Sequence, residues 1–287
     1  MRKVISKILF LVGFLIFIFP FVIRVISYLN QTTAIYRYEN TSNNMSQEEK
    51  ENELDKSNKY NEELSDQSPI INIGDENFNV DVSVSSFDFL NTGEVIGTLI
   101  IPKINVELPI YDGIENDNLQ KGVSLLKNTS YPTGEPSTHS VIAGHSGLTR
   151  AKILDNLNEI QVGDEFLVEY LGNTNNYEVI DIKVVLPDET DSLQIVEDET
   201  LVTLVTCTPK NINTHRLLVT GKITQMPEKI DISVWDRVKA FILDYSLYII
   251  AIVILIVALI VYVIKGIKKR RKKNNNIKIN TNGGNNG

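Results

Sequence analysis

The chain has 287 residues and a formal net charge of −8, a size that allows one medium domain together with membrane segments. Three Lys or Arg precede Ile8 and eight follow Ile264, and neither end contains Asp or Glu. The middle of the chain therefore holds 17 basic residues against 36 acidic ones. Such an acidic region argues against nucleic acid as a partner and suits a solvated domain.

A nearly pure apolar run extends from Ile8 to Ile23, directly after three basic residues. A cleaved signal peptide begins in the same way, but its apolar core is usually about 7–15 residues long and ends at a small-residue cleavage site. This run is longer, and residues 26–30 offer no such site. We therefore predict a cytoplasmic N-terminus and an uncleaved transmembrane anchor over residues 1–29, with a signal peptide as the alternative.

The segment from 30 to 92 is predicted to lie outside the cell, next to the membrane. Ser46 followed by Glu49 forms a capping-box pattern, which predicts that a helix begins there. The apolar positions of this helix are only Leu54, Tyr60 and Leu64. We therefore expect a helix that packs weakly, with a solvated spacer as the alternative. The irregular sequence from 67 to 92 is placed to cover part of the following domain.

From residue 93 onward the pattern changes to short β-branched and aromatic runs between turn residues, which predicts a mainly β domain over 93–226. These runs are Val95–Ile101, Val106–Tyr111, Ser140–Ala143, Glu165–Leu171, Tyr177–Leu186, Leu201–Thr206 and Arg216–Ile223. Many short strands with few helices favour a closed barrel or a sandwich. One short helix is predicted from the helical spacing of Ala151, Leu154, Leu157 and Ile160.

After a linker over 227–246, a second apolar stretch covers Leu247–Ile264 without any charge. Its 18 residues would rise about 27 Å as a helix, close to the roughly 30 Å of a bilayer core, and a buried core helix is the alternative. The basic tail over 265–287 resembles a nucleic-acid patch, but its place directly after an apolar span fits a cytoplasmic flank. We predict a two-pass protein of the cell membrane, with both termini in the cytoplasm and the β domain over 93–226 outside.

Cys207 is the only cysteine, so the chain has no internal disulfide. It stands near the end of an apolar strand, in the sequence Thr-Leu-Val-Thr-Cys-Thr-Pro that Pro209 closes. A single extracellular thiol forms an intermolecular bridge, stays inert in a core, or reacts as a nucleophile. The polar neighbours Thr206 and Thr208 favour partial exposure, and therefore reactivity.

A cysteine nucleophile needs a base or a cation nearby, because its thiolate is the reactive form. Of the three histidines, His145 lies between glycines that leave its imidazole accessible, whereas His139 is expected only to pack or to bond locally. Arg216 is predicted to lie across a hairpin from Cys207, where its guanidinium would stabilise an oxyanion. Because adjacent strand residues face opposite ways, His215 then points away from the site.

These residues stand in motifs that resemble the active-site signature of sortases, most of all the class C, or pilus-assembling, group. The resemblance covers about residues 93–224 and the layout of two membrane anchors. The matching stretches are Gly97–Ile104, Leu108–Tyr111, Thr138–Gly147, Thr203–Pro209, Asn213–Val219 and Gly221, with a weaker likeness at Tyr60, Asn61 and Leu64.

The resemblance implies a sortase-type β-barrel and a catalytic set of Cys207, His145 and Arg216, without a cofactor or metal. It implies that Cys207 attacks the Thr–Gly bond of an LPXTG-like sorting signal and forms a thioester. His145 would protonate the leaving amine, and Arg216 would hold the substrate. The acceptor would be a lysine amine of a pilin. The alternatives are attachment of surface proteins to the cell-wall peptide, or a cell-surface module without catalysis.

Two features depart from the pattern of that group. Its members usually carry a lid with an Asp-Pro-aromatic motif, whereas this chain offers only Asp75-Glu-Asn-Phe78 or Asp88-Phe89, without the proline. We therefore expect either a nonstandard lid between Asp75 and Phe89 or no lid. The Tyr-Gly that usually follows the proline of the signature is replaced by Lys210-Asn211, which would alter the rim of the cleft.

Overall fold

The computed structural model describes residues 2–66, 71, 73, 95–113, 116–148 and 151–225, and scattered positions between 246 and 268. The chain divides into two compact units, residues 1–231 and 232–287. Most of the expected second span, most of the basic tail and the whole candidate lid over 75–89 lie outside the described residues.

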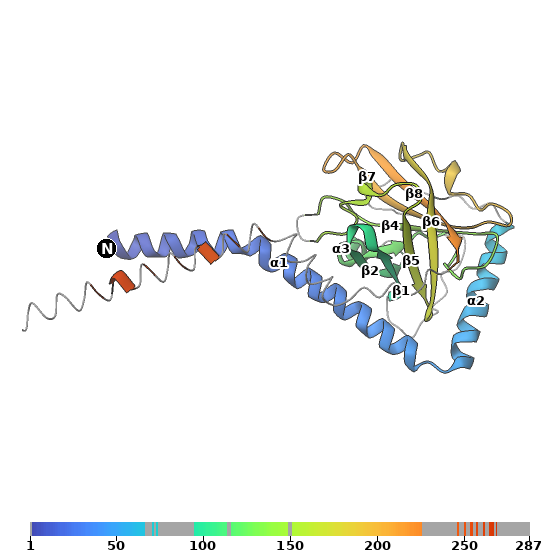
Figure 1. Cartoon of the computed structure of the whole chain (residues 1–287), viewed down its shortest axis with the longest axis horizontal. Helices are drawn as coiled ribbons and strands as arrows, with labels where there is room; N and C mark the ends of the chain where they lie inside the picture. The colour runs from blue at the N-terminus through green and yellow to red at the C-terminus, as the bar shows by residue number, and fades with distance from the viewer. Residues whose placement is uncertain are drawn as a thin grey trace, which may run out of the picture. The chain divides into compact units, whose positions relative to one another are not determined.

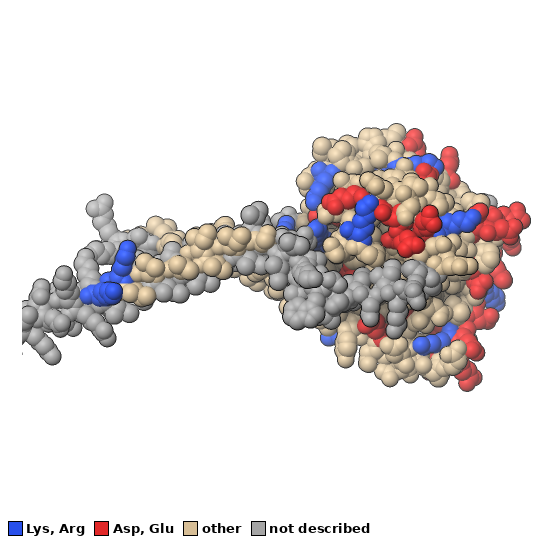
Figure 2. Space-filling view, viewed as in Figure 1, with Lys and Arg blue, Asp and Glu red and all other residues tan. Residues whose placement is uncertain are grey.

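Eight strands in the described part of the chain close into one barrel, in the order β1-β2-β3-β4-β7-β8-β6-β5 (Figure 1). This confirms the expected mainly β fold as a barrel and not a sandwich. The strands are β1 (Val95–Ile101), β2 (Val106–Asp112), β3 (Val123–Leu125), β4 (Thr138–Ala143), β5 (Glu165–Tyr170), β6 (Asn173–Val185), β7 (Thr200–Thr208) and β8 (His215–Thr224). All seven predicted strands are present, and the three-residue β3 was missed. Acidic side chains are spread over the face of the barrel that Figure 2 shows.

The strands pair antiparallel except at two places, where β2 runs parallel to β3 and β4 runs parallel to β7. Their inward side chains form the larger apolar core, which includes Leu99, Ile142, Val202 and Leu204. A second apolar cluster contains Val141, Ala143, Val205 and Leu218, which alternate along β4, β7 and β8 with the members of the first core. The sheet around β7 is therefore covered by apolar residues on both of its faces.

The prediction of a short helix between Ala151 and Ile160 is wrong in the type and length of the element. Only a 3₁₀ turn, η2 (Leu157–Glu159), forms in this stretch. The four apolar side chains are all buried, but the backbone N–H of Leu154 donates to the carbonyl of His145 at 3.0 Å. That bond ties the segment to the loop after β4. The other short helical elements are α3 (Asn116–Lys121), η1 (Pro102–Ile104) and η3 (Asp191–Leu193).

Helix α1 (Arg2–Asn44) is continuous through Pro20 and extends well beyond residue 29, where we expected the anchor to end. By length and composition, its segment Val12–Asn44 is apolar enough to cross a membrane, which indicates membrane anchoring. The last turns pack on the barrel, where the hydroxyl of Tyr38 donates to Glu169 Oε1 at 3.3 Å and accepts from the Leu171 N–H at 2.8 Å. The end of this helix is thus fixed to the hairpin between β5 and β6.

Helix α2 (Gln47–Ser65) begins at the predicted capping box, in which Ser46 Oγ accepts from the Glu49 N–H and the Ser46 N–H donates to Glu49 Oε2. It lies on the barrel more firmly than its sparse apolar positions suggested. Tyr60 and Leu64 are buried. The amide of Asn61 donates to the Tyr131 carbonyl at 3.0 Å and accepts from the Tyr131 N–H at 2.8 Å. These two hydrogen bonds of Asn61 hold the helix on the barrel in place of the apolar contacts that it lacks.

The substitution Asn61→Ala is expected to destabilise the protein by about 1–3 kcal/mol, because it leaves the buried N–H of Tyr131 without this partner, while the Tyr131 carbonyl keeps the Thr133 N–H. Chemical unfolding of the full chain in detergent measures this loss. The control is Glu62→Ala, which removes an exposed side chain from the same helix. Equal stability of the two variants would contradict a role of Asn61 in docking α2.

Candidate active site

The parallel pairing of β4 with β7 sets the position of His145 beside Cys207. The register pairs Ala143 with Val205. The contact continues past the strand, since the Gly144 N–H donates to the Val205 carbonyl at 2.9 Å and Thr206 Oγ1 donates to the Gly144 carbonyl at 2.7 Å. His145 and Cys207 each lie two residues beyond the Ala143–Val205 pair. The same register therefore brings the two residues to the same edge of the barrel.

Strand β8 supplies the third residue of the predicted set. The antiparallel register pairs Cys207 with Arg216, as expected from the sequence. Cys207 follows Val205 by two residues, and Arg216 precedes Leu218 by two, so both lie on the face that carries the second apolar cluster. His215 pairs with Thr208 and takes the opposite face, again as expected.

The residues at this edge line one open cavity with a volume of about 320 Å³. Ala143, Val205, Thr206, Cys207 and Arg216 contribute from the strands, and residues 144–148 from the loop after β4. Asn211, Asn213 and Leu119 complete the lining. The side chain of Cys207 is partly exposed. The structure therefore brings His145, Cys207 and Arg216 together around one opening.

Arg216 is almost fully buried, with 2% of its surface exposed. Its Nε donates to the carbonyl of Ile73 at 2.8 Å, and its Nη1 donates to the carbonyls of Asn213 and His215 at 3.1 and 3.2 Å. Ile71 and Ile73 are themselves buried in the second apolar cluster. These bonds fix the plane of the guanidinium at the edge of the cavity. The contact with Ile73 has no local sequence signal, because 143 positions separate the two residues.

The loop that carries His145 is fastened to its surroundings by side chains. Ser146 Oγ donates to the carbonyl of Cys207 at 2.6 Å, and the Gly147 N–H donates to Asp155 Oδ1 at 2.7 Å. Gly147 has a φ of +80°, a conformation that glycine adopts most readily. Neither Ser146 nor Asp155 was predicted as part of the site. Ser146 directly follows His145 within the matching stretch Thr138–Gly147, and this position is the signal that could have identified it.

His139 takes no part in the cavity. Its Nδ1 donates to the Gln194 carbonyl at 2.8 Å, so its Nε2 accepts from Thr203 Oγ1 at 2.7 Å. Burial lowers the pKa of this imidazole below its ordinary value. His139 thus has a packing and bonding role outside the cavity, as expected, although its two partners lie 55 and 64 positions away in the chain. Among the described residues, no group of three or more His, Cys, Asp or Glu side chains is arranged to hold a metal ion.

A pH-dependent loss of stability follows from the lowered pKa of His139. The unfolded chain takes up a proton near the ordinary pKa of histidine, and the folded chain resists it, so stability decreases as the pH falls through that range. The substitution His139→Gln should remove this part of the pH dependence. Thermal unfolding of both forms between pH 5 and pH 8 tests it, and parallel pH curves would contradict it.

Similarity to known proteins identifies the family of the barrel. The family model described as the sortase domain matches residues 99–224. Sortase D of Bacillus subtilis is 33% identical over 118 residues, which cover 41% of this chain and 57% of that protein. The chain thus spans little more than half of that curated relative.

Solved structures extend the likeness over more of the chain. Sortase C1 of Streptococcus agalactiae pilus island 1 is 37% identical, with a TM-score of 0.63, and the match covers 71% of this chain and 96% of that one. Sortase C of Clostridium perfringens, solved with the C-terminal cell wall sorting motif, is 40% identical with a TM-score of 0.59 and covers 68% and 100%. The chain belongs to the sortase family of cysteine transpeptidases, and its structural neighbours are class C sortases.

Proposed function

We propose that this protein cleaves an LPXTG-like sorting signal through a thioester on Cys207 and transfers the acyl group to a lysine amine of a pilin. The observation that carries the proposal is the shared cavity of Cys207, His145 and Arg216 in a chain of the sortase family. An acyl transfer needs a nucleophile, a proton carrier and a group that stabilises an oxyanion. These three side chains supply one of each.

In the first half of the reaction, the sulfur of Cys207 attacks the carbonyl carbon of the signal's Thr. The C–S bond forms as the C–N bond to Gly breaks, and the proton of the thiol reaches the leaving amine through His145. In the second half, the acceptor amine attacks the thioester and gives its proton to His145. The thiolate leaves, and an amide bond joins the two proteins.

Arg216 presents a positively charged guanidinium to the substrate in a fixed orientation. Its Nε and Nη1 are held by three backbone carbonyls, so the guanidinium needs no reorganisation when negative charge develops on the substrate oxygen. Burial strengthens this effect because little water screens the charge. The register that places Arg216 opposite Cys207 supports its role at the bond that reacts.

The choice of a pilin lysine as acceptor rests on the class C neighbours, one of which belongs to a pilus island. A sortase C solved with a cell wall sorting motif supports an LPXTG-like donor for this chain as well. The second apolar stretch, Leu247–Ile264, fits the same group. The rival acceptor is the amine of the cell-wall peptide, which would make the protein a sortase that attaches surface proteins.

The protein is proposed to lie in the cell membrane with its barrel outside. The apolar α1 carries well-exposed residues such as Leu9, Ile16 and Phe19, which suit contact with lipid. The basic residues at both ends of the chain favour a cytoplasmic location for both termini. The boundaries proposed from the sequence, an anchor over 1–29, a catalytic barrel over 93–226 and a second span over 247–264, follow this topology.

Substitution of the three residues tests the mechanism in the full chain in detergent. Cys207→Ala should abolish cleavage of an LPXTG-type peptide, and His145→Ala and Arg216→Lys should each lower its rate by about 100-fold or more. The matched control is His215→Ala, which removes an imidazole next to Arg216 on the other face and should keep the rate within about twofold. Liquid chromatography with mass spectrometry measures the cleaved peptide. Full cleavage by the Cys207→Ala variant would refute the mechanism.

The acceptor is identified from the product. The full chain is incubated with a candidate pilin that carries an LPXTG-like signal, and separately with a cell-wall peptide that ends in an amine. We expect an isopeptide bond between the signal's Thr and a pilin lysine, found by mass spectrometry of the digested product. A product that contains only the cell-wall peptide would show that the donor chemistry is right and the pilin acceptor is wrong.

A further inference from the structure

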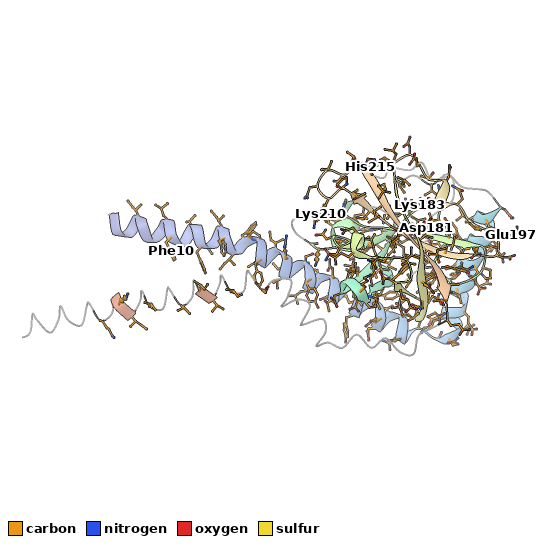
Figure 3. The ribbon with its side chains drawn as sticks, turned by 45° about the horizontal axis from the view of Figure 1, so that its top comes forward. Phe10, Asp181, Lys183, Glu197, Lys210 and His215 are labelled. Atoms are coloured by element: carbon orange, nitrogen blue, oxygen red, sulfur yellow. The ribbon has the colours of Figure 1, made fainter. Side chains whose placement is uncertain are left out.

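Two loops at the edge of the cavity are joined by a carboxylate that lies outside the cavity lining. Asp155 Oδ1 accepts from the Gly147 N–H at 2.7 Å, and Asp155 Oδ2 accepts from Lys210 Nζ at 2.8 Å. Gly147 belongs to the loop that carries His145, and Lys210 follows the strand that carries Cys207. Figure 3 labels Lys210 at the periphery of the barrel. Asp155 thus connects the proposed proton carrier with the segment that bears the nucleophile.

The segment around Asp155 holds the His145 loop at two points, the carbonyl of His145 and the N–H of Gly147. The N–H of Leu154 donates to the His145 carbonyl at 3.0 Å, and Asp155 binds the Gly147 N–H two residues further on. The two loops also approach closely, because a Cβ on Gly147 would come within 2.7 Å of Asn211 Oδ1. A shift of Gly147 would therefore move His145 relative to the segment after Cys207.

The two bonds of Asp155 differ in strength. A hydrogen bond from a backbone N–H to an ionised carboxylate is roughly twice as strong as a neutral one. The side chain of Asp155 is 11% exposed, which protects that bond, whereas Lys210 is 48% exposed. An ion pair with one exposed partner contributes little and is screened by salt. The bond to Gly147 is therefore the main constraint, and Lys210 tunes it.

We propose that Asp155 is a positioning residue, which holds His145 beside Cys207 through the Gly147 N–H and is oriented by Lys210. The inference rests on the proposed function, because it assigns Asp155 a part in the same reaction. Lys210 stands where the class C pattern usually has tyrosine. In this chain, Lys210 at the altered rim of the cleft therefore helps to hold the loop that carries His145.

The test compares four single variants of the full chain in detergent, together with the two double variants that combine Lys210→Met with each substitution of Asp155. Asp155→Ala removes both bonds, Asp155→Asn keeps an oxygen for Gly147, and Lys210→Met removes only the cation. The matched control is Asp164→Ala. Asp164 also accepts hydrogen bonds from a backbone N–H, that of Gln161, and from the ammonium group of Lys103, and it lies outside the cavity lining. Thermal unfolding of each variant separates a loss of folding from a loss of positioning.

Two readouts are measured on each variant. The first is kcat and KM for cleavage of an LPXTG-type peptide. The second is the rate of alkylation of Cys207 by iodoacetamide against pH, which needs no peptide. A displaced imidazole should lower kcat while the peptide still binds, and it should move the midpoint of the alkylation profile to higher pH.

We expect Asp155→Ala to lower kcat about tenfold with KM changed less than about twofold, and to raise the alkylation midpoint. Asp155→Asn should recover most of the rate, Lys210→Met should cost about twofold, and adding Lys210→Met to Asp155→Ala should change nothing further. The control Asp164→Ala should leave both readouts as in the wild type, even where it lowers the unfolding temperature. This pattern supports positioning.

The proposal is overturned if Asp155→Ala and Asp164→Ala have the same effects on kcat and on alkylation. It is also overturned if the Lys210→Met effect persists at full size without Asp155. If Asp155→Ala does not fold, kcat and the alkylation profile are compared among Asp155→Asn, Lys210→Met and the variant that carries both substitutions. Should the wild type cleave no peptide, the proposed function fails, and the alkylation profiles still test the positioning of His145.

Discussion

The parallel register of β4 and β7 is the constraint on which the site depends. It pairs Ala143 with Val205, and two residues further on each strand leads to His145 or Cys207. The antiparallel register of β7 and β8 then places Arg216 opposite Cys207. A shift of one residue in either pairing would turn one of these side chains to the other face of the sheet. Closure of the barrel helps to fix both registers, because each of the eight described strands pairs with a neighbour on both of its sides.

The site lies where the second apolar cluster ends. Val205 and Leu218 are packed in that cluster, and the next positions on the same face of the two strands are Cys207 and Arg216. Packed apolar residues therefore support the site from one side, while the cavity opens on the other. Ile73 belongs to the cluster and also accepts the bond from Arg216 Nε, so the segment before the barrel takes part in orienting the guanidinium. In the proposed chemistry, the partly exposed thiol of Cys207 therefore reacts from a strand that packed apolar residues hold in place.

Much of the fold was predictable because strand runs and turn residues leave local patterns, and the hairpin from β7 to β8 is short enough for its register to be inferred. The pairing of β4 with β7 was not predictable, since β5 and β6 lie between them in the chain. The helical spacing from Ala151 to Ile160 was misleading, because burial alone produced it, while the Leu154 N–H bonds to His145. Asn61 was named only for its likeness to the class C helix, so its role in docking α2 was missed, and Asp155 was missed altogether. Asn61 binds backbone groups of Tyr131, 70 positions away, and Asp155 binds the Gly147 N–H, eight positions away. Hydrophobic periodicity reports neither kind of bond.

The central claim is that the β4, β7 and β8 registers form a site at which Cys207 becomes acylated. The most direct measurement is the intact mass of the full chain after brief mixing with an LPXTG-type peptide without an acceptor amine, followed by acid quenching and peptide mapping. The account predicts an added mass equal to the peptide up to its Thr, located on Cys207 and released by hydroxylamine. Cleavage of the peptide with no adduct on Cys207, or with the adduct on another residue, would contradict it.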